Sequence, residues 1–291
     1  MTASDQPRPD SFPEQQQDPP GATDLMDPVP DHGEESYRGS GRLEGRRALI
    51  TGGDSGIGRA VALAYAREGA DVAFTYQSDE QLDADATTAL VTAEGRVCQP
   101  IAADLRTSGG CDDAVARAVD GLGGLDVLVN NAGYQMAREE QLEDMTDENI
   151  DRTYKTNLYA VLWLTRAALP HLGEGSVVIN NSSIQAFDPS TSLLDYASSK
   201  TAINNLTVNL AAQLGPRGIR VNAVAPGPIW TPLQPATQNA EKVAQLGHDT
   251  PLGRAGQPAE VAPAFVFLAS ASDASYVSGT VLGVTGGKPV F

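Results

Sequence analysis

The segment RRALITGGDSGIG, residues 46–58, decides the fold that the sequence predicts. A strand-like run, RRALIT, leads directly into a glycine-rich turn, and the helix-like RAVALAYAREG follows. Glycines let the backbone of such a turn approach a pyrophosphate, and the free amides and positive dipole at the start of a helix favour its charge. The glycine spacing is GxxxGxG rather than GxGxxG, so a plain tight turn is the alternative interpretation.

Six further runs rich in β-branched residues follow, each bounded by polar or glycine residues. They span residues 71–76, 95–101, 125–130, 176–180, 219–225 and 281–285. Strands that alternate with helical segments are typical of a parallel sheet covered on both faces. We therefore expect one Rossmann-type domain over residues 43–291, a three-layer αβα sandwich with a seven-stranded parallel sheet.

The first 42 residues differ in composition from the rest of the chain. Residues 1–40 contain 7 of the 19 prolines, with 9 acidic and 2 basic side chains. Such a segment buries too little apolar surface to offset the entropy lost on ordering. We predict a mostly disordered extension, with an interaction arm as the alternative.

Charge and composition exclude several classes of function. The 291-residue chain has a net charge of −17 and a pI near 4.4, which disfavours binding to nucleic acid or to an anionic membrane surface. No apolar run is long enough to span a bilayer and no secretory signal is evident, so a cytoplasmic location is expected. The two cysteines and three histidines show no metal-ligand spacing, and we predict no metal site.

Two residues four positions apart, Tyr196 and Lys200, are the candidate catalytic pair. They belong to YASSK at the start of a helical stretch, so both side chains lie on one helix face. A neighbouring ammonium favours the phenolate and is expected to lower the tyrosine pKa toward the range used for proton transfer. Many helices contain this spacing by chance, so the interpretation depends on the residues around it.

Other polar groups follow the predicted strands at the edge where open α/β sheets bind ligands. Ser183 follows the fifth strand and could hydrogen-bond a substrate oxygen, although a polar turn is common there. NNAG, residues 130–133, ends the fourth strand, and PGPIWT, residues 226–231, ends the sixth. The proline-rich segment 226–258 interrupts the strand–helix alternation, and we expect a substrate loop or lid over about 228–258.

The second strand ends at Tyr76-Gln77-Ser78, where a dinucleotide site reads the adenosine ribose. An acidic residue at this point selects NAD, and a basic residue accommodates the 2′-phosphate of NADP. Neither is present, and Gln77 or Ser78 could hydrogen-bond a phosphate. The sequence slightly favours NADP(H), with NAD(H) as the alternative.

Together these motifs resemble the classical short-chain dehydrogenases/reductases over essentially residues 43–291. TGGDSGIG, NNAG, Ser183, YASSK and PGPIWT occur in that family's order, with a closing Gly286-Gly287. The subgroup most resembled is the bacterial NADP-dependent aldehyde or alcohol reductases that carry a polar N-terminal extension and the stretches GGDSGIGRA, SSIQAF and APGPIWT. The 42-residue leader exceeds the family's minimal form, and no catalytic role transfers to it.

By this resemblance Asn157, Ser183, Tyr196 and Lys200 form a catalytic tetrad. Tyr196 would exchange a proton with the substrate oxygen while Ser183 orients that oxygen. Lys200 would hold the nicotinamide ribose, and Asn157 would position a proton-relaying water. The expected nucleotide-binding residues are Gly52, Asp54, Ser55, Gly56, Ile57, Gly58, Tyr76, Gln77, Ser78, Asp104, Leu105, Asn131, Ala132, Gly133, Tyr196, Lys200, Pro226, Gly227, Ile229 and Thr231.

The resulting hypothesis is an oxidoreductase that interconverts a small alcohol and an aldehyde or ketone, and by resemblance a homotetramer. A cofactor-binding sensor or interaction protein on the same fold is the alternative from another class. A reductase of enoyl thioesters is a third possibility, although that subclass typically spaces its tyrosine and lysine more widely. Sugar, steroid, aldehyde and acyl-thioester substrates all stay open, with Leu193, Trp230 and Leu233 as candidates for an apolar wall or for packing.

Overall fold

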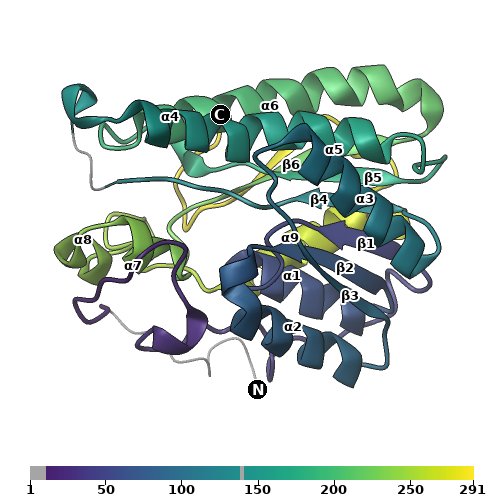
Figure 1. Cartoon of the computed structure of the whole chain (residues 1–291), viewed down its shortest axis with the longest axis horizontal. Coiled ribbons are helices and arrows are strands. Elements are labelled where there is room, and N and C mark those ends of the chain that lie inside the picture. Colours follow the sequence, from purple (N-terminus) through teal and green to yellow (C-terminus); the bar gives the residue numbers. More distant parts are fainter. Residues whose placement is uncertain (1–10, 138–140) are drawn as a thin grey trace.

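A computed structural model describes residues 11–137 and 141–291 (Figure 1). Within them, seven parallel strands form one sheet in the order β3-β2-β1-β4-β5-β6-β7. The strands are β1 Arg47–Ile50, β2 Asp71–Tyr76, β3 Cys98–Ala102, β4 Val127–Asn130, β5 Val177–Asn181, β6 Arg220–Pro226 and β7 Val281–Val284. The predicted seven-stranded parallel sheet is confirmed, with strand ends displaced by up to three residues.

Helices cover both faces of the sheet. One face carries α1 Gly56–Arg67, α2 Gln81–Ala93 and α9 Pro258–Ala269, and the other carries α3 Ser108–Leu122, α5 Ala160–Ala168 and α6 Leu194–Leu214. The shorter helices are α4 Asp147–Tyr154, α7 Leu233–Thr237, α8 Ala240–Ala244 and α10 Ala271–Ala274. Single turns occur as η1 Thr23–Leu25, η2 Ser78–Glu80, η3 Leu142–Asp144, the π-helical η4 Lys155–Tyr159, η5 Ile184–Ala186 and η6 Gly215–Arg217.

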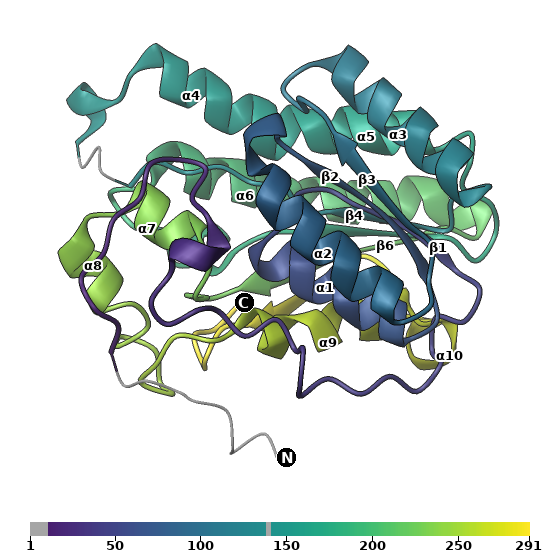
Figure 2. The ribbon, with the colours of Figure 1, turned by 60° about the horizontal axis from the view of Figure 1, so that its bottom comes forward.

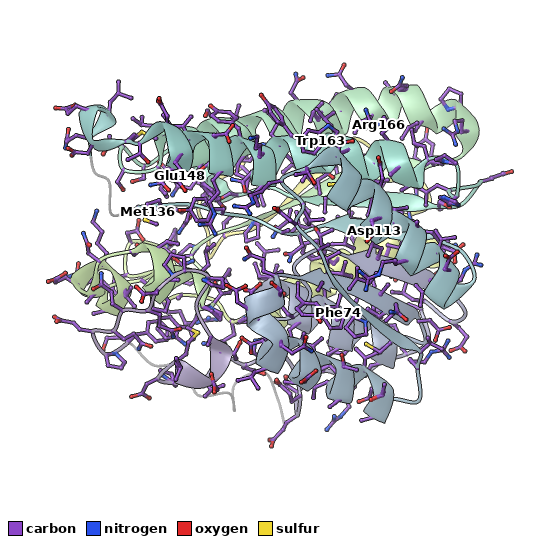
Figure 3. The ribbon with its side chains drawn as sticks, in the orientation of Figure 1. Phe74, Asp113, Met136, Glu148, Trp163 and Arg166 are labelled. Carbon is purple, nitrogen blue, oxygen red and sulfur yellow. The ribbon has the colours of Figure 1, made fainter. Side chains whose placement is uncertain are left out.

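Strand residues alternate between two apolar cores, as expected for a sheet buried on both sides. In β1, Ala48 and Ile50 belong to the core under α1 and α9, whereas Leu49 belongs to the core under α3 and α5. Figure 3 shows Phe74 of β2 and Trp163 of α5 in these two separate layers. In the part of the chain that the structure describes, no helix is long and apolar enough to cross a membrane.

The strand order reverses between β1 and β4, which lie side by side with Ile50 paired to Val129. Crevices at such a reversal are where α/β sheets bind ligands, beyond the carboxyl ends of the strands. The glycine-rich turn after β1 and NNAG after β4 therefore lie at one edge of the sheet. The observed strand order thus brings these two motifs side by side.

The N-terminal extension differs from the prediction of disorder. In Figure 2 residues 11–42 pass α8 and then α7 at the left of the molecule, and afterwards run below α9 toward α10. Phe12 and Met26 are buried against the domain. In the structure, residues 11–42 thus pack against the domain as an extended arm. Composition missed this because the few apolar residues of the extension pack against the domain rather than against each other. Residues 1–10 lie outside the described part.

Candidate active site

Ser183, Tyr196 and Lys200 meet where β5 ends and α6 begins. Ser183 follows β5 and caps η5, its Oγ accepting a hydrogen bond from the Gln185 amide at 3.1 Å. Tyr196 and Lys200 lie one turn apart on α6, with Lys200 Nζ 5.4 Å from the centre of the Tyr196 ring. The hydroxyl, the phenol and the amine that the sequence singled out thus lie in one wall, which we call the catalytic wall.

Lys200 is almost entirely enclosed by protein. Its side chain is 3% exposed, and Nζ donates a hydrogen bond to the Asn181 carbonyl oxygen at 2.8 Å. Burial lowers the pKa of Lys200 to about 7, because the ammonium loses hydration. The amine therefore changes charge close to neutral pH.

The pKa of Tyr196 moves in the opposite direction to the sequence-based expectation. Burial raises it above its ordinary value, while the hydrogen bond with Ser183 opposes this. The expected lowering by the Lys200 charge is not seen, because burial dominates for the phenol and itself weakens the charge on Lys200. The phenol is consequently protonated at neutral pH, which suits a proton donor.

Asn157 lies behind the catalytic wall, in the π-helical turn η4. Its Oδ1 accepts from the Tyr134 amide at 2.8 Å, and its Nδ2 donates to the Tyr134 carbonyl at 2.8 Å and to Ser199 Oγ at 3.1 Å. The amide is fully engaged within the protein and does not line the cavity. The structure therefore gives the Asn157 side chain a bracing position, and the role of Asn157 in positioning a relay water stays a prediction.

An asparagine bridge connects the catalytic wall to the glycine-rich turn. Asn181 Nδ2 donates to Asn131 Oδ1 at 2.9 Å, and Asn131 Nδ2 donates to the carbonyls of Thr51 and Gly52, both at 2.9 Å. The backbone carbonyl of Asn181 also holds Lys200. The ends of β1, β4 and β5 are thereby fixed relative to one another. The sequence did not single out Asn181, although a polar residue at the end of a buried strand was an available signal.

A cavity of about 500 Å³ opens along this edge of the sheet. Ser183, Tyr196 and Lys200 line it together with most of the expected nucleotide-binding residues. Those that line it are Gly52, Asp54, Ser55, Gly56, Ile57, Tyr76, Gln77, Asp104, Leu105, Asn131, Ala132, Gly133, Pro226, Gly227, Ile229 and Thr231. Gly58 and Ser78 do not.

The glycine-rich turn forms a narrow cradle at the start of α1. Gly56 has φ of +50°, in the left-handed region that favours glycine, and lines the cavity. A Cβ at Gly58 would lie 1.9 Å from the Gly52 carbonyl oxygen, which no side chain tolerates. Gly58 therefore serves close packing of the turn against the helix rather than direct contact with a ligand.

The far end of the cavity, beside β2, is more acidic than the sequence indicated. Gln77 and Asp54 line it as expected, but so does Glu80, whose carboxylate accepts from the Gln77 amide at 3.0 Å. Burial raises the pKa of both carboxyl groups, and repulsion between Asp54 and Glu80 raises that of Asp54 further. Ser78 is exposed and outside the cavity. Of the two residues that could hydrogen-bond a 2′-phosphate, Gln77 and Ser78, only Gln77 lines the cavity.

Sequence reasoning missed one part of the cavity wall, because Pro19 and Pro20 of the distant N-terminal extension line it. Segment 231–238, which includes α7 and lies within the loop predicted over about 228–258, lines it as well. Leu193 and Leu233 line it as the sequence suggested. Trp230 does not, because it is fully buried against Phe12 of the extension. We refer to residues 228–257 as the lid.

The residues present fit a dinucleotide. The glycine cradle at the start of α1 offers backbone amides to a pyrophosphate. Two buried side-chain oxygens along the cavity, Asp54 Oδ2 and Asn181 Oδ1, have no hydrogen-bond partner within the described protein. Buried polar atoms without partners are rare, and ribose hydroxyls, which both donate and accept hydrogen bonds, are groups that would satisfy them. The cavity volume is within the usual range for small-molecule sites.

Comparison with known proteins agrees with this geometry. A family model described as enoyl-(acyl carrier protein) reductase matches residues 52–288. An NADP complex of a short-chain dehydrogenase from Burkholderia cenocepacia superimposes with a TM-score of 0.77 at 38% identity, covering 85% of this chain and 99% of that one.

Curated relatives are similar over more of the chain. An uncharacterized oxidoreductase of Bacillus subtilis, YhxD, is 52% identical over 96% of this chain and 94% of its own length. The glucose and ribitol dehydrogenase of Daucus carota is 45% identical over 96% and 97%, and the chloroplastic NADPH-dependent aldehyde reductase 1 of Arabidopsis thaliana is 45% identical over 93% and 96%. A match to 96% of 291 residues leaves about 12 unmatched, so the match with YhxD includes most of the N-terminal extension.

Proposed function

This chain belongs to the short-chain dehydrogenase/reductase family of NAD(P)-dependent oxidoreductases, and from that premise we propose that it interconverts an alcohol and an aldehyde or ketone. NADP(H) is the proposed nucleotide, supported by the NADP complex of the Burkholderia protein and by the name of the Arabidopsis aldehyde reductase. The observation that carries the proposal is the placement of Ser183, Tyr196 and Lys200 in one wall of the cavity.

A bound nicotinamide nucleotide would supply a hydride to the carbonyl carbon, and the protein supplies the proton that the carbonyl oxygen needs. Tyr196, kept protonated by burial, donates that proton from its hydroxyl. Ser183 donates a hydrogen bond to the same oxygen and stabilises the charge that develops there. Lys200 holds a ribose hydroxyl near Tyr196. In the oxidative direction the same phenol oxygen, once deprotonated, accepts the alcohol proton.

Reduction of enoyl thioesters is the other reaction that the same assay tests. The matched family model names enoyl thioesters, whereas the Daucus and Arabidopsis relatives are named for sugar, polyol and aldehyde substrates. The four-residue interval between Tyr196 and Lys200 supports the alcohol–carbonyl reaction. The homotetramer and the cytoplasmic location stay predictions.

The test is the fall in NADPH absorbance, and separately NADH absorbance, with purified protein and a panel of aldehydes, ketones, sugars, β-ketoacyl thioesters and enoyl thioesters. We expect oxidation of NADPH by an aldehyde or ketone. Tyr196→Phe should lower kcat by about 10³-fold, within the range for a lost general acid, while nucleotide binding persists. Tyr159→Phe, on a 43% exposed tyrosine, is the matched control. Turnover that survives Tyr196→Phe, or reduction of enoyl thioesters alone, would refute the proposal.

A further inference from the structure

The N-terminal arm, residues 11–42, crosses the outside of the cavity that would hold the nucleotide. Figure 2 shows it passing α8 and α7, and the Thr23 amide further along the arm contacts Asp83 of α2. Midway along this path Pro19 and Pro20 line the same cavity as Ser55 and Ile57 of the glycine-rich turn. A segment that served folding alone would have no need to form part of this wall.

The front of the arm is joined to the lid by a small apolar core. The rings of Phe12 and Trp230 stack with their centres 3.8 Å apart and their planes 7° from parallel. Met26, Val243 and Ala255 complete a buried cluster around them. Because Trp230 lies between Ile229 and Thr231, both in the cavity wall, the arm is packed directly behind residues expected to meet the nucleotide.

Polar contacts hold the arm against the lid at several further points. Trp230 Nε1 donates to the Pro28 carbonyl at 2.7 Å, and the Gln17 amide donates to the Pro235 carbonyl at 2.9 Å. Gly21, with φ of +85°, approaches the lid so closely that a Cβ there would lie 2.7 Å from the Pro232 carbonyl oxygen. The arm and the lid therefore form one body on this side of the cavity.

The next part of the arm is fixed to the opposite side of the cavity. The Thr23 amide donates to Asp83 Oδ2 at 3.1 Å, and Asp83 is paired with the buried guanidinium of Arg59. Arg59 Nε in turn donates to the Asp54 carbonyl at 2.8 Å, within the glycine-rich turn. The arm thus ties the lid on one side to the cradle for the pyrophosphate on the other, across the cavity.

We propose that residues 12–28 are part of the nucleotide site: they form its outer wall, hold the lid over the bound dinucleotide, and thereby set the rate at which NADP(H) leaves. The inference rests on the proposed function, since it requires a dinucleotide in this cavity. A nucleotide held beneath Pro19 and Pro20 leaves only when the arm and lid separate. The Phe12–Trp230 stack is the contact whose loss should speed that step most.

The experiment measures NADPH release by stopped flow, following the fluorescence of bound NADPH as excess NADP⁺ displaces it from the full-length protein. Phe12→Ala should raise the release rate and the KM for NADPH about tenfold, and a chain lacking residues 2–30 should raise them further. Leu25→Ala removes a side chain from the same arm that is 68% exposed, and should change either quantity by less than twofold. The shortened chain keeps residues 31–42, which are anchored separately on α1.

Melting temperatures of all variants separate this effect from simple loss of stability. A release rate unchanged by both Phe12→Ala and the truncation, with a lowered melting temperature, would overturn the arm proposal and leave the proposed function intact. A wild-type chain that binds neither NADPH nor NADH would overturn the proposed function, and the arm proposal with it. If the truncated chain does not fold, the NADPH release rate of Phe12→Ala alone tests the arm proposal, because this variant leaves the rest of the arm in place.

Discussion

The catalytic wall and the N-terminal arm lie on different sides of one cavity and are held in place by different forces. Ser183 follows β5 and Lys200 lies on α6, and the asparagine bridge connects the end of β5 to the glycine-rich turn. The only helical element of residues 11–42 is the 3₁₀ turn η1, so the path of the arm depends on its contacts with the domain. The catalytic groups thus lie on a hydrogen-bonded frame, whereas the segment proposed to control nucleotide release lies outside the sheet.

The arm itself divides into two parts. Residues 33–42 are anchored by charge: Arg42, Tyr37 and the Ser40 amide all hydrogen-bond the buried carboxylate of Glu68, and Arg67 donates to main-chain carbonyls of the arm. Residues 12–28 are held mainly by the aromatic stack and main-chain hydrogen bonds, and only they line the cavity. We expect the first part to govern stability and the second to govern nucleotide release.

The largest effect should follow from Lys200→Met, which breaks the catalytic wall. Loss of the amine should reduce kcat/KM by about 10³-fold or more. The pKa of Lys200 near 7 adds a pH signature: the amine is charged below pH 7 and loses its charge as the pH rises through 7. Nucleotide affinity of the wild type should therefore fall across that range in titrations at several pH values. The variant should show no such fall, and Lys155→Met, at an exposed ion pair, should retain it.

Ser183→Ala should give the next largest effect. Removing one hydrogen-bond donor to a developing oxyanion costs about 10²–10³-fold in kcat, with little change in melting temperature. Steady-state kinetics at saturating NADPH measure the loss. Ser198→Ala, a hydroxyl on the exposed side of the same helix, is the control and should stay within twofold of wild type. Equal losses in the two variants would contradict a specific role for Ser183.

Glu68→Gln tests the charged anchor of the arm. Burial opposes ionisation, but hydrogen bonds from Arg42 and Tyr37 outweigh it and lower the pKa of Glu68 to about 2 from an ordinary 4.5. The folded-state pKa is the lower one, so this stabilisation is complete above pH 4.5 and is lost as the pH falls toward 2. The variant should lose about 2–3 kcal/mol at pH 7 and less in acid, with kcat unchanged.

Thermal unfolding at pH 7 and near pH 3 checks this expectation. Glu94→Gln removes a partly exposed ion pair with Arg67 and should cost under about 1 kcal/mol at either pH. A large loss of kcat in Glu68→Gln would contradict the division of the arm into a stabilising and a functional part.

The smallest effect should come from Trp230→Phe, which keeps an aromatic ring beside Phe12 but removes the donor to the Pro28 carbonyl. Loss of this hydrogen bond should cost about 1 kcal/mol and raise the KM for NADPH by two- to threefold at unchanged kcat. Trp163→Phe, on α5 in the other helical layer (Figure 3), is the matched control and should leave the KM unchanged. A KM equal in the two variants would weaken the link between arm and lid.

Much of the catalytic wall could be predicted because its signals are local. One signal is a strand followed by a glycine-rich turn and a helix, and the other is a tyrosine and a lysine one helical turn apart. Both depend only on the backbone geometry of a single segment. Parallel strands bring their carboxyl ends to one edge, so the sequence alone predicts that Ser183, Asn131 and Thr231 lie near one another. The family resemblance supplied the expected roles of these residues.

Burial and contacts between distant segments were decided by the tertiary structure. The pKa of Tyr196 depends on how much water the folded domain excludes, and the sequence-based expectation had the wrong sign for it. Asn157 lies near the site, as the resemblance implies, yet its amide is taken up by Tyr134 and Ser199.

The sequence by itself determined the sheet, the order of the motifs and the chemical groups at the edge of the cavity, because each follows from periodicity or from spacing within one segment. Only the tertiary structure decided that residues 11–42 form a packed arm and that Pro19, Pro20 and Glu80 face the ligand cavity. A composition poor in apolar residues predicts disorder when a segment is considered alone. It cannot reveal that Phe12 has a partner in Trp230, 218 positions further along the chain, whose ring makes its burial favourable.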